Sequence, residues 1–101
     1  MDCKFSPGII YTTAGVNELR NQNEEFNSFV FTSLTRHLSC DWGDIDPEDE
    51  QLNLESLSPT NPGRLFSSYH FPQYTNLNDW KIWIITEWDR SATTILFPHE
   101  Y

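Results

Sequence analysis

Acidic side chains crowd one short stretch of the chain. Residues 41–50 read Asp-Trp-Gly-Asp-Ile-Asp-Pro-Glu-Asp-Glu, with six carboxylates and no basic residue. Such a stretch can cap a helix and face solvent, it can bind a basic protein surface, or it can hold a divalent cation. The cation is the least favoured of the three, because the acids do not follow the ligand spacing of an EF-hand loop.

Helix capping accounts for part of this stretch, because Asp46 can cap a helix whose first turn holds Glu48 and Asp49. Trp42 favours binding instead, since protein interfaces use aromatic anchors of this kind. We therefore predict a partner-binding patch, called here the acidic segment. Its residues are Asp41, Trp42, Asp44, Asp46, Glu48, Asp49 and Glu50.

A second polar group, Glu87, Asp89 and Arg90, lies between two apolar runs near the end of the sequence. A solvated turn with an Asp–Arg pair would contribute little to stability. The alternative is a small hydrolase or nuclease that uses these three residues on rigid strands. A carboxylate-based nuclease would also need a nearby lysine, and Lys81 is six residues away from Glu87.

Motifs for known chemistry are missing from the sequence, so we predict no catalytic residue and no enzyme activity. There is no nucleophile elbow, phosphate-binding loop, zinc-protease helix or dinucleotide fingerprint. His37-x-x-Cys40 is at best half of a zinc site, so no metal or cofactor is expected.

Cys3 and Cys40 are expected to be free thiols in a cytoplasmic protein, because the start of the chain lacks the features of a signal peptide. Their spacing in the sequence does not exclude a disulfide.

Size and charge restrict the class of partner. The 101 residues predict one domain, 1–101, in which residues 1–8 form a loose terminus. Seven Phe, four Tyr and four Trp residues are enough for a globular core. The net charge of −9 argues against direct binding to nucleic acid or to an anionic membrane. It favours basic protein partners, including nucleic-acid-binding proteins whose grooves normally receive phosphate.

The chain is organised around a β-hairpin predicted at residues 80–98, where two β-branched and aromatic runs flank a polar turn. Apolar residues three and four apart predict an amphipathic helix over 23–38. A second helix is expected over 47–56, after an Asp-Pro start. Residues 64–71 and 9–13 are expected to be strands.

The order of these elements predicts an α+β fold. Two or three N-terminal helices would pack on one face of a three- to four-stranded antiparallel sheet. The helix over 47–56 would contribute a short apolar side from Leu52, Leu54 and Leu57. The pairing of the N-terminal strand is left open.

Three segments of the chain, 13–17, 41–44 and 81–98, resemble a family of small bacterial proteins of plasmids and other mobile elements, the plasmid-related proteins. The resemblance covers roughly residues 11–101, and its last block is long and specific. It implies no catalytic residues. The connection at 72–79 departs from the family pattern, because it is longer and rich in Asn and aromatic residues.

Small acidic proteins of mobile elements are often inhibitors of host defence nucleases, among them anti-CRISPR and anti-restriction proteins. Together with the charge, this analogy predicts a non-enzymatic binding protein that contacts a CRISPR effector or a restriction enzyme directly. The alternatives are the hydrolase or nuclease described above and a regulatory homodimer with an exposed sheet edge.

Overall fold

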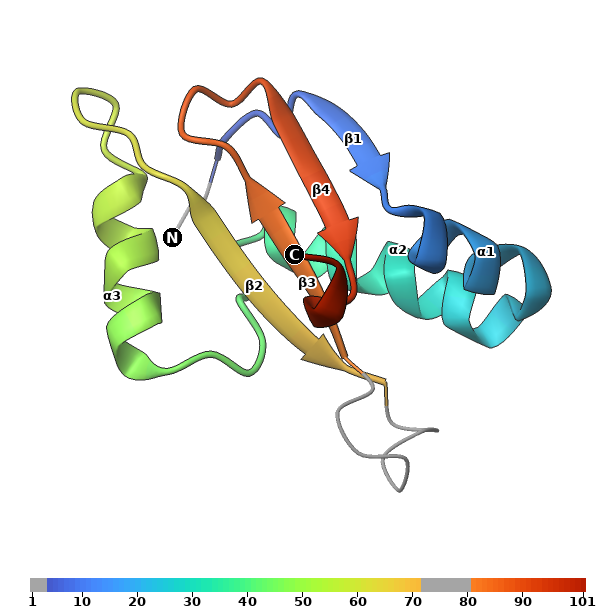
Figure 1. Cartoon of the computed structure of the whole chain (residues 1–101). Helices are drawn as coiled ribbons and strands as arrows, with labels where there is room; N and C mark the ends of the chain where they lie inside the picture. The colour runs from blue at the N-terminus through green and yellow to red at the C-terminus, as the bar shows by residue number, and fades with distance from the viewer. Residues whose placement is uncertain (1–3, 72–80) are drawn as a thin grey trace.

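Residues 4–71 and 81–101 are described by the computed structural model, in which four strands form one mixed sheet in the order β1–β4–β3–β2 (Figure 1). The α+β fold predicted from the sequence is confirmed. The elements are, in chain order, β1 (Ile9–Thr12), α1 (Ala14–Gln22), α2 (Glu24–Leu38), α3 (Pro47–Ser56), β2 (Leu65–His70), β3 (Lys81–Thr86), β4 (Ala92–Leu96) and a short 3-10 turn, η2 (Pro98–Glu100).

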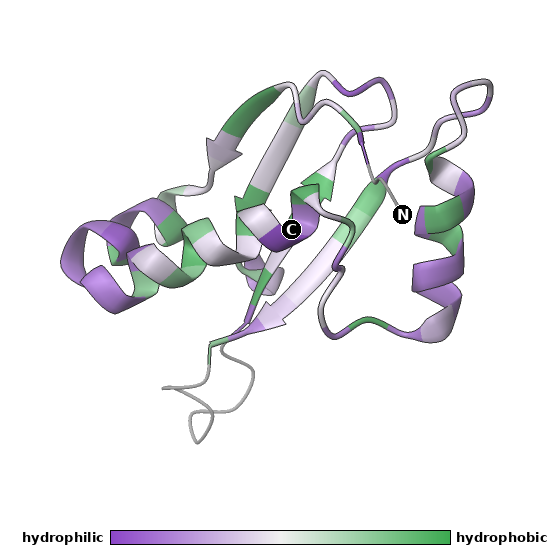
Figure 2. Ribbon diagram, turned by 180° about the vertical axis from the view of Figure 1, so that it is seen from behind, coloured by the Kyte–Doolittle hydropathy of each residue, from purple (hydrophilic) through white to green (hydrophobic). Residues whose placement is uncertain are grey.

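The hydrophobic core fills the space between α1, α2 and one face of the sheet. Its buried side chains are Val16, Phe26, Val30, Tyr69, Phe71, Ile82, Ile84 and Ile95. They come from one side of each helix and from alternate positions of the strands, as the two periodicities require. Figure 2 shows the hydrophobic segments of α1 and α2 interrupted by strongly hydrophilic ones, which is the pattern of half-buried helices. No helix in the described ranges is long and apolar enough to cross a membrane.

The predicted hairpin is confirmed as the antiparallel pair β3 and β4, in which Trp83 lies opposite Leu96. β3 is central, since it also pairs with β2. Ile82 and Ile84 are fully buried on the core side, whereas Ile85 is 6% exposed and faces the other side with Trp83. This central position explains why β3 is apolar on both faces. The predicted connection at 72–79 lies outside the described residues.

The N-terminal strand corrects the prediction of a purely antiparallel sheet. β1 forms one edge of the sheet and runs parallel to β4, with Ile9 beside Ala92 and Thr12 beside Ile95. Parallel pairing needs a long connection, and the two strands are separated by most of the chain. A four-residue strand carries no local signal for its direction, so tertiary contacts decided it.

Helix α2 is confirmed within one residue of its predicted start. Asn23 separates it from α1, and its side-chain oxygen accepts the N–H three residues later at 3.0 Å. At the other end, Cys40 has a left-handed backbone, with φ 62°. Its N–H donates to the carbonyl of His37 at 3.1 Å, and the N–H of Asp41 donates to that of Arg36 at 2.9 Å. These two bonds form a Schellman motif, which ends the helix.

Cys40 is disulfide-bonded, so the prediction of a free thiol at this position is wrong. Cys3 lies outside the described residues. A disulfide depends on the separation of two Cα atoms in space, and spacing along the chain does not reveal that separation.

Helix α3 has its predicted bounds, but its buried side is polar rather than apolar. Leu52 and Leu54 are 58% and 42% exposed, whereas Asn53 is 2% exposed. The amide nitrogen of Asn53 donates to the carbonyl of Phe66 at 2.7 Å, and its oxygen accepts the N–H of the same residue at 3.0 Å. Asn53 thus bonds to the free edge of β2 as a neighbouring strand would, and this contact attaches α3 to the sheet.

Candidate functional site

The structure divides the acidic segment into a paired part and an unpaired part. Arg36 Nε donates to Asp41 Oδ2 at 2.7 Å, and Arg36 Nη2 donates to Asp41 Oδ1 at 3.1 Å. This hydrogen-bonded ion pair lowers the pKa of Asp41. Asp44 Oδ2 lies 2.8 Å from His70 Nδ1. Asp41 and Asp44 therefore already have partners within the protein.

Trp42 is not the exposed anchor that the sequence suggested. Only 5% of its surface is exposed, and its ring stacks on Phe5 and meets His37 edge-on. The backbone of Gly43, with φ 75°, lies so close to β2 that a Cβ atom there would stand 2.1 Å from the carbonyl oxygen of Ser68. This close approach directs Trp42 into the core. The stacking of Phe5 on Trp42 shows in addition that residues 4–8, which were expected to be loose, contact the core.

The remaining acids lie at the N-cap of α3 or on the helix itself, where Asp46, Glu48 and Glu50 are exposed and Asp49 is half-buried. Glu55, farther along α3, is exposed as well, which makes four exposed acids. None of the four forms an ion pair with another described residue. Two of them, Glu48 and Glu55, line a shallow depression together with Leu52, one of the most exposed apolar side chains among the described residues. The residues called here the α3 acidic surface are Asp46, Pro47, Glu48, Glu50, Gln51, Leu52 and Glu55.

A groove that the sequence did not predict lies on the sheet face opposite α1 and α2. It consists of two adjoining hollows of about 250 and 260 Å³ that share Arg64, Ile85 and Tyr101. η2 and the last residue border one side of it, and α3 borders the other. The residues of this outer groove are Thr13, Asp49, Arg64, Phe66, Trp83, Ile85, Glu87, Thr94, Leu96, Glu100 and Tyr101.

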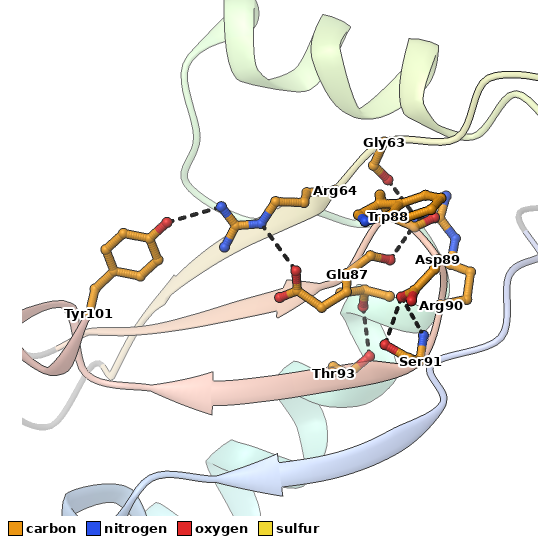
Figure 3. A network of polar contacts seen from close by, with 10 residues as sticks. Gly63, Arg64, Glu87, Trp88, Asp89, Arg90, Ser91, Thr93 and Tyr101 are labelled. Carbon is orange, nitrogen blue, oxygen red and sulfur yellow. Dashed lines mark hydrogen bonds and ion pairs between the residues drawn. The ribbon is translucent and has the colours of Figure 1, made fainter.

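Arg64 lies at the junction of the two hollows (Figure 3). Its Nη1 donates to the hydroxyl of Tyr101 at 3.0 Å, and its Nε lies 3.7 Å from Glu87 Oε1. The hydrogen bond to Tyr101 and the charge of Glu87 raise the pKa of Arg64. The side chains of Arg64 and Glu87 are 46% and 41% exposed, so a ligand can reach both of them.

Three aromatic rings give the groove its apolar wall. Phe66 and Trp83 meet edge-on with centroids 5.3 Å apart, and Trp83 meets Tyr101 in the same way at 5.9 Å. Asp49 of α3 lines the same hollow, so the groove is continuous with the predicted acids. A signal for this groove existed in the sequence, because β2 and β3 carry aromatic residues on the face opposite the core.

Arg90, a candidate for catalysis in the hydrolase alternative, braces the backbone. Its Nη1 donates to the carbonyls of Gly63 at 2.6 Å and Glu87 at 3.1 Å, and its Nη2 donates to that of Ser56 at 2.8 Å. The guanidinium thus joins the end of α3 to the turn of the hairpin. Figure 3 shows Arg90 between Gly63 and this turn. Burial lowers the pKa of Arg90, and both of its terminal nitrogens donate to main-chain oxygens.

Glu87 and Asp89 also have separate contacts. Glu87 extends toward Arg64, whereas Asp89 Oδ1 accepts bonds from the N–H of Ser91 at 3.0 Å and from its hydroxyl at 2.6 Å. The three residues therefore do not converge on one point where a substrate could bind. This arrangement gives the hydrolase alternative no geometric support.

The arrangement most like a nucleophile and its base is buried. His37 and Ser67 are fully buried, with His37 Nδ1 2.5 Å from Ser67 Oγ. His37 Nε2 lies 2.9 Å from Thr86 Oγ1, which lies 2.7 Å from Thr93 Oγ1. Thr93 donates to the carbonyl of Pro7 at 2.7 Å.

The donor and the acceptor of every hydrogen bond in this network follow from its last member, Thr93. Because the Thr93 hydroxyl donates to a carbonyl, Thr86 must donate to Thr93 and accept from His37 Nε2. Nδ1 is then the acceptor, and Ser67 donates to it. This hydrogen-bond network is therefore structural. Each of its side chains has a hydrogen-bond partner, His37 is neutral, and no substrate reaches it.

The described residues contain no cluster of three or more His, Cys, Asp or Glu that could hold a metal ion. Comparison of the chain with protein-family models, with curated proteins and with solved structures gives no match. The resemblance to plasmid-related proteins therefore stays a prediction, and function has to be argued from the α3 acidic surface and the outer groove.

Proposed function

We propose that this protein is a non-enzymatic acidic binding protein that contacts a basic protein partner through the α3 acidic surface and the adjoining outer groove. The partner class that fits is a nucleic-acid-binding defence complex, such as a CRISPR effector or a restriction enzyme, which the protein would inhibit by direct contact. The origin on a mobile element rests on the resemblance of residues 13–17, 41–44 and 81–98.

One observation carries the proposal: α3 presents exposed carboxylates with no cationic partner among the described residues. Residues 46–56 contain five acids and no Lys or Arg. Unpaired charges of one sign steer association with a surface of opposite sign and disfavour other partners. A protein groove that receives phosphate is such a surface.

The outer groove supplies the apolar contact that Trp42 does not. Asp49 lines the same hollow as the three aromatic rings of Phe66, Trp83 and Tyr101. Tight interfaces combine such aromatic anchors with a polar rim. Arg64 already lies over the Tyr101 ring, with its guanidinium carbon 5.7 Å from the ring centroid, so an apolar side chain of the partner would pack against Phe66 and Trp83.

The test compares two charge-reversal variants with the same change in net charge. Glu48→Lys with Glu55→Lys alters the α3 acidic surface, and Glu18→Lys with Glu25→Lys alters α1 and α2 on the other side of the molecule. Glu48 and Glu25 each occupy the second position of a helix, so the cost against the helix dipole is matched. Circular dichroism checks that both variants fold.

Tagged wild-type protein is first used to recover its partner from host lysate at low salt, and the recovered nuclease is then purified and its cleavage of DNA is titrated. We expect stoichiometric inhibition by the wild type, weakened by added salt. The α3 variant should bind at least about tenfold more weakly, and the control should bind as the wild type does. Equal binding by the two variants would contradict the role of α3, and failure of the wild type to inhibit any recovered nuclease would contradict the function.

A further inference from the structure

β1 is an edge strand with an unusually apolar and exposed surface. Ile9, Ile10 and Tyr11 are 62%, 44% and 50% exposed. All three belong to residue types that favour strands. Figure 2 shows the start of β1 among the most hydrophobic segments at the margin of the sheet. Soluble proteins usually protect such an edge with Lys, Pro or a bulge, and residues 9–12 contain none of these protections.

The backbone groups available on this edge follow from the ladder with β4. The N–H of Ile9 donates to Ser91 at 3.1 Å, and that of Thr13 donates to Ile95 at 3.0 Å. Alternate residues of a strand direct their N–H and C=O groups to opposite sides, so Ile10 and Thr12 direct theirs away from the sheet. No described strand pairs with them.

The edge strand and the residues on either side of it carry no charged side chain. Residues 5–17 contain no Asp, Glu, Lys or Arg, in a chain whose net charge is −9. Two copies brought together at β1 would therefore avoid direct contact between carboxylates. The charges elsewhere on each copy are screened by salt at separations beyond about 10 Å.

We propose that β1 is a self-association edge, at which two copies of this protein pair antiparallel about a two-fold axis at Tyr11. The two outward-facing residues set this register. Ile10 of one copy lies opposite Thr12 of the other, and each such pair exchanges two N–H···O bonds. The result is one continuous eight-stranded sheet.

The side chains of this pairing are self-complementary. Tyr11 lies opposite its own copy at the non-hydrogen-bonded position, where cross-strand side chains approach most closely. Ile9 lies diagonal to Tyr11 of the other copy on the same face. The same register offers nothing to a strongly basic peptide, because no acid lies in residues 5–17. We therefore expect a second copy of the protein, and not a basic peptide, to pair with β1. This surface is separate from the one proposed for the basic partner.

Sedimentation equilibrium over a range of protein concentrations tests this pairing on the full chain. Ile10→Pro removes one outward donor per copy, and thus two of the four bonds, without removing a bond to β4. We expect a reversible dimer for the wild type and a dissociation constant raised at least about tenfold in the variant. Ile10→Thr, which keeps the donor and the strand preference, is the matched control and should dimerise.

Tyr11→Lys provides a second test if Ile10→Pro does not fold, because it places like charges opposite each other at the axis and should abolish the dimer. A wild type that stays monomeric at every concentration would overturn the proposal, as would a dimer that neither substitution weakens. Salt separates the two interfaces. Added salt should strengthen the self-association of two acidic chains and weaken binding to a basic partner.

Discussion

His37 makes the stability of the protein depend on pH. Burial lowers the pKa of His37 to about 4 in the folded state, from an ordinary value of 6.5. At a pH between these two values, the unfolded chain binds a proton that the folded chain does not. The contribution of neutral His37 to the free energy of unfolding is therefore complete above the unfolded-state pKa, and it is lost as the pH falls toward the folded-state pKa. We expect the free energy of unfolding, measured with urea, to fall by about 2 kcal/mol on going from neutral pH to about pH 5.

His37→Gln is the control for this effect, since an amide can donate and accept but does not titrate in this range. The variant should be less stable at neutral pH, because the buried hydroxyls of Ser67 and Thr86 lose part of their network. Its stability should be nearly flat over the same interval. If the variant lost as much stability as the wild type between the two pH values, other groups would be responsible.

The sequence predicted the positions of some individual side chains correctly and those of others wrongly. Glu48 and Asp49 lie in the first turn of a helix that the Asp-Pro start predicted, and Asp46 occupies the N-cap position, although its side chain makes no capping hydrogen bond. Trp42 was assigned to the wrong environment. Its place in the core depends on the approach of Gly43 to β2, twenty-five residues later in the chain.

At the scale of elements, Glu100 joins the end of the chain to the start of α1. Its carboxylate accepts the hydroxyl of Thr13 at 2.6 Å and the N–H of Gly15 at 3.1 Å, and also the N–H of Phe97 at 3.0 Å. Burial raises the pKa of Glu100, but these hydrogen bonds outweigh it, so the net pKa is lowered. The N-cap residue Thr13 makes no side-chain cap of its own, and the Glu100 carboxylate supplies the acceptor.

We expect Glu100→Ala to lower the free energy of unfolding by about 1–3 kcal/mol, because it leaves three donors without an acceptor and removes an anion from the start of a helix. Urea unfolding measures the loss. Glu18→Ala, an exposed change within α1, should cost less than about 0.5 kcal/mol. Equal costs for the two variants would show that the contact to Glu100 contributes nothing to stability.

The elements also show where local signals end. The hairpin and α2 have strong patterns and lie where the sequence predicted them. α3 has its predicted bounds but a different buried side, because Asn53 bonds to the edge of β2 and carries the leucines outward. A helical pattern shows which residues share a face, but the neighbouring element decides which face is buried.

At the scale of the whole molecule, the sheet order predicts a gradient of stability. β3 is bonded on both sides, whereas β1 is bonded on one side and exposes its apolar residues. Native-state hydrogen exchange in dilute protein should therefore show the slowest exchange in β3, near the rate of global unfolding, and the fastest exchange among the strands in β1. Protection of β1 should rise with protein concentration if two copies pair there. Protection of β1 equal to that of β3 in dilute solution would contradict this order.

The sequence by itself determined the α+β class, the hairpin, the bounds of α2 and α3, and the strongly acidic net charge. These follow from charge, capping, turn chemistry and periodicity, which act within a few residues. The tertiary structure alone decided the parallel direction of β1, the burial of Trp42 and the outer groove between α3 and Tyr101. Each of these depends on the meeting of segments that are far apart in the chain, so no local pattern encodes it.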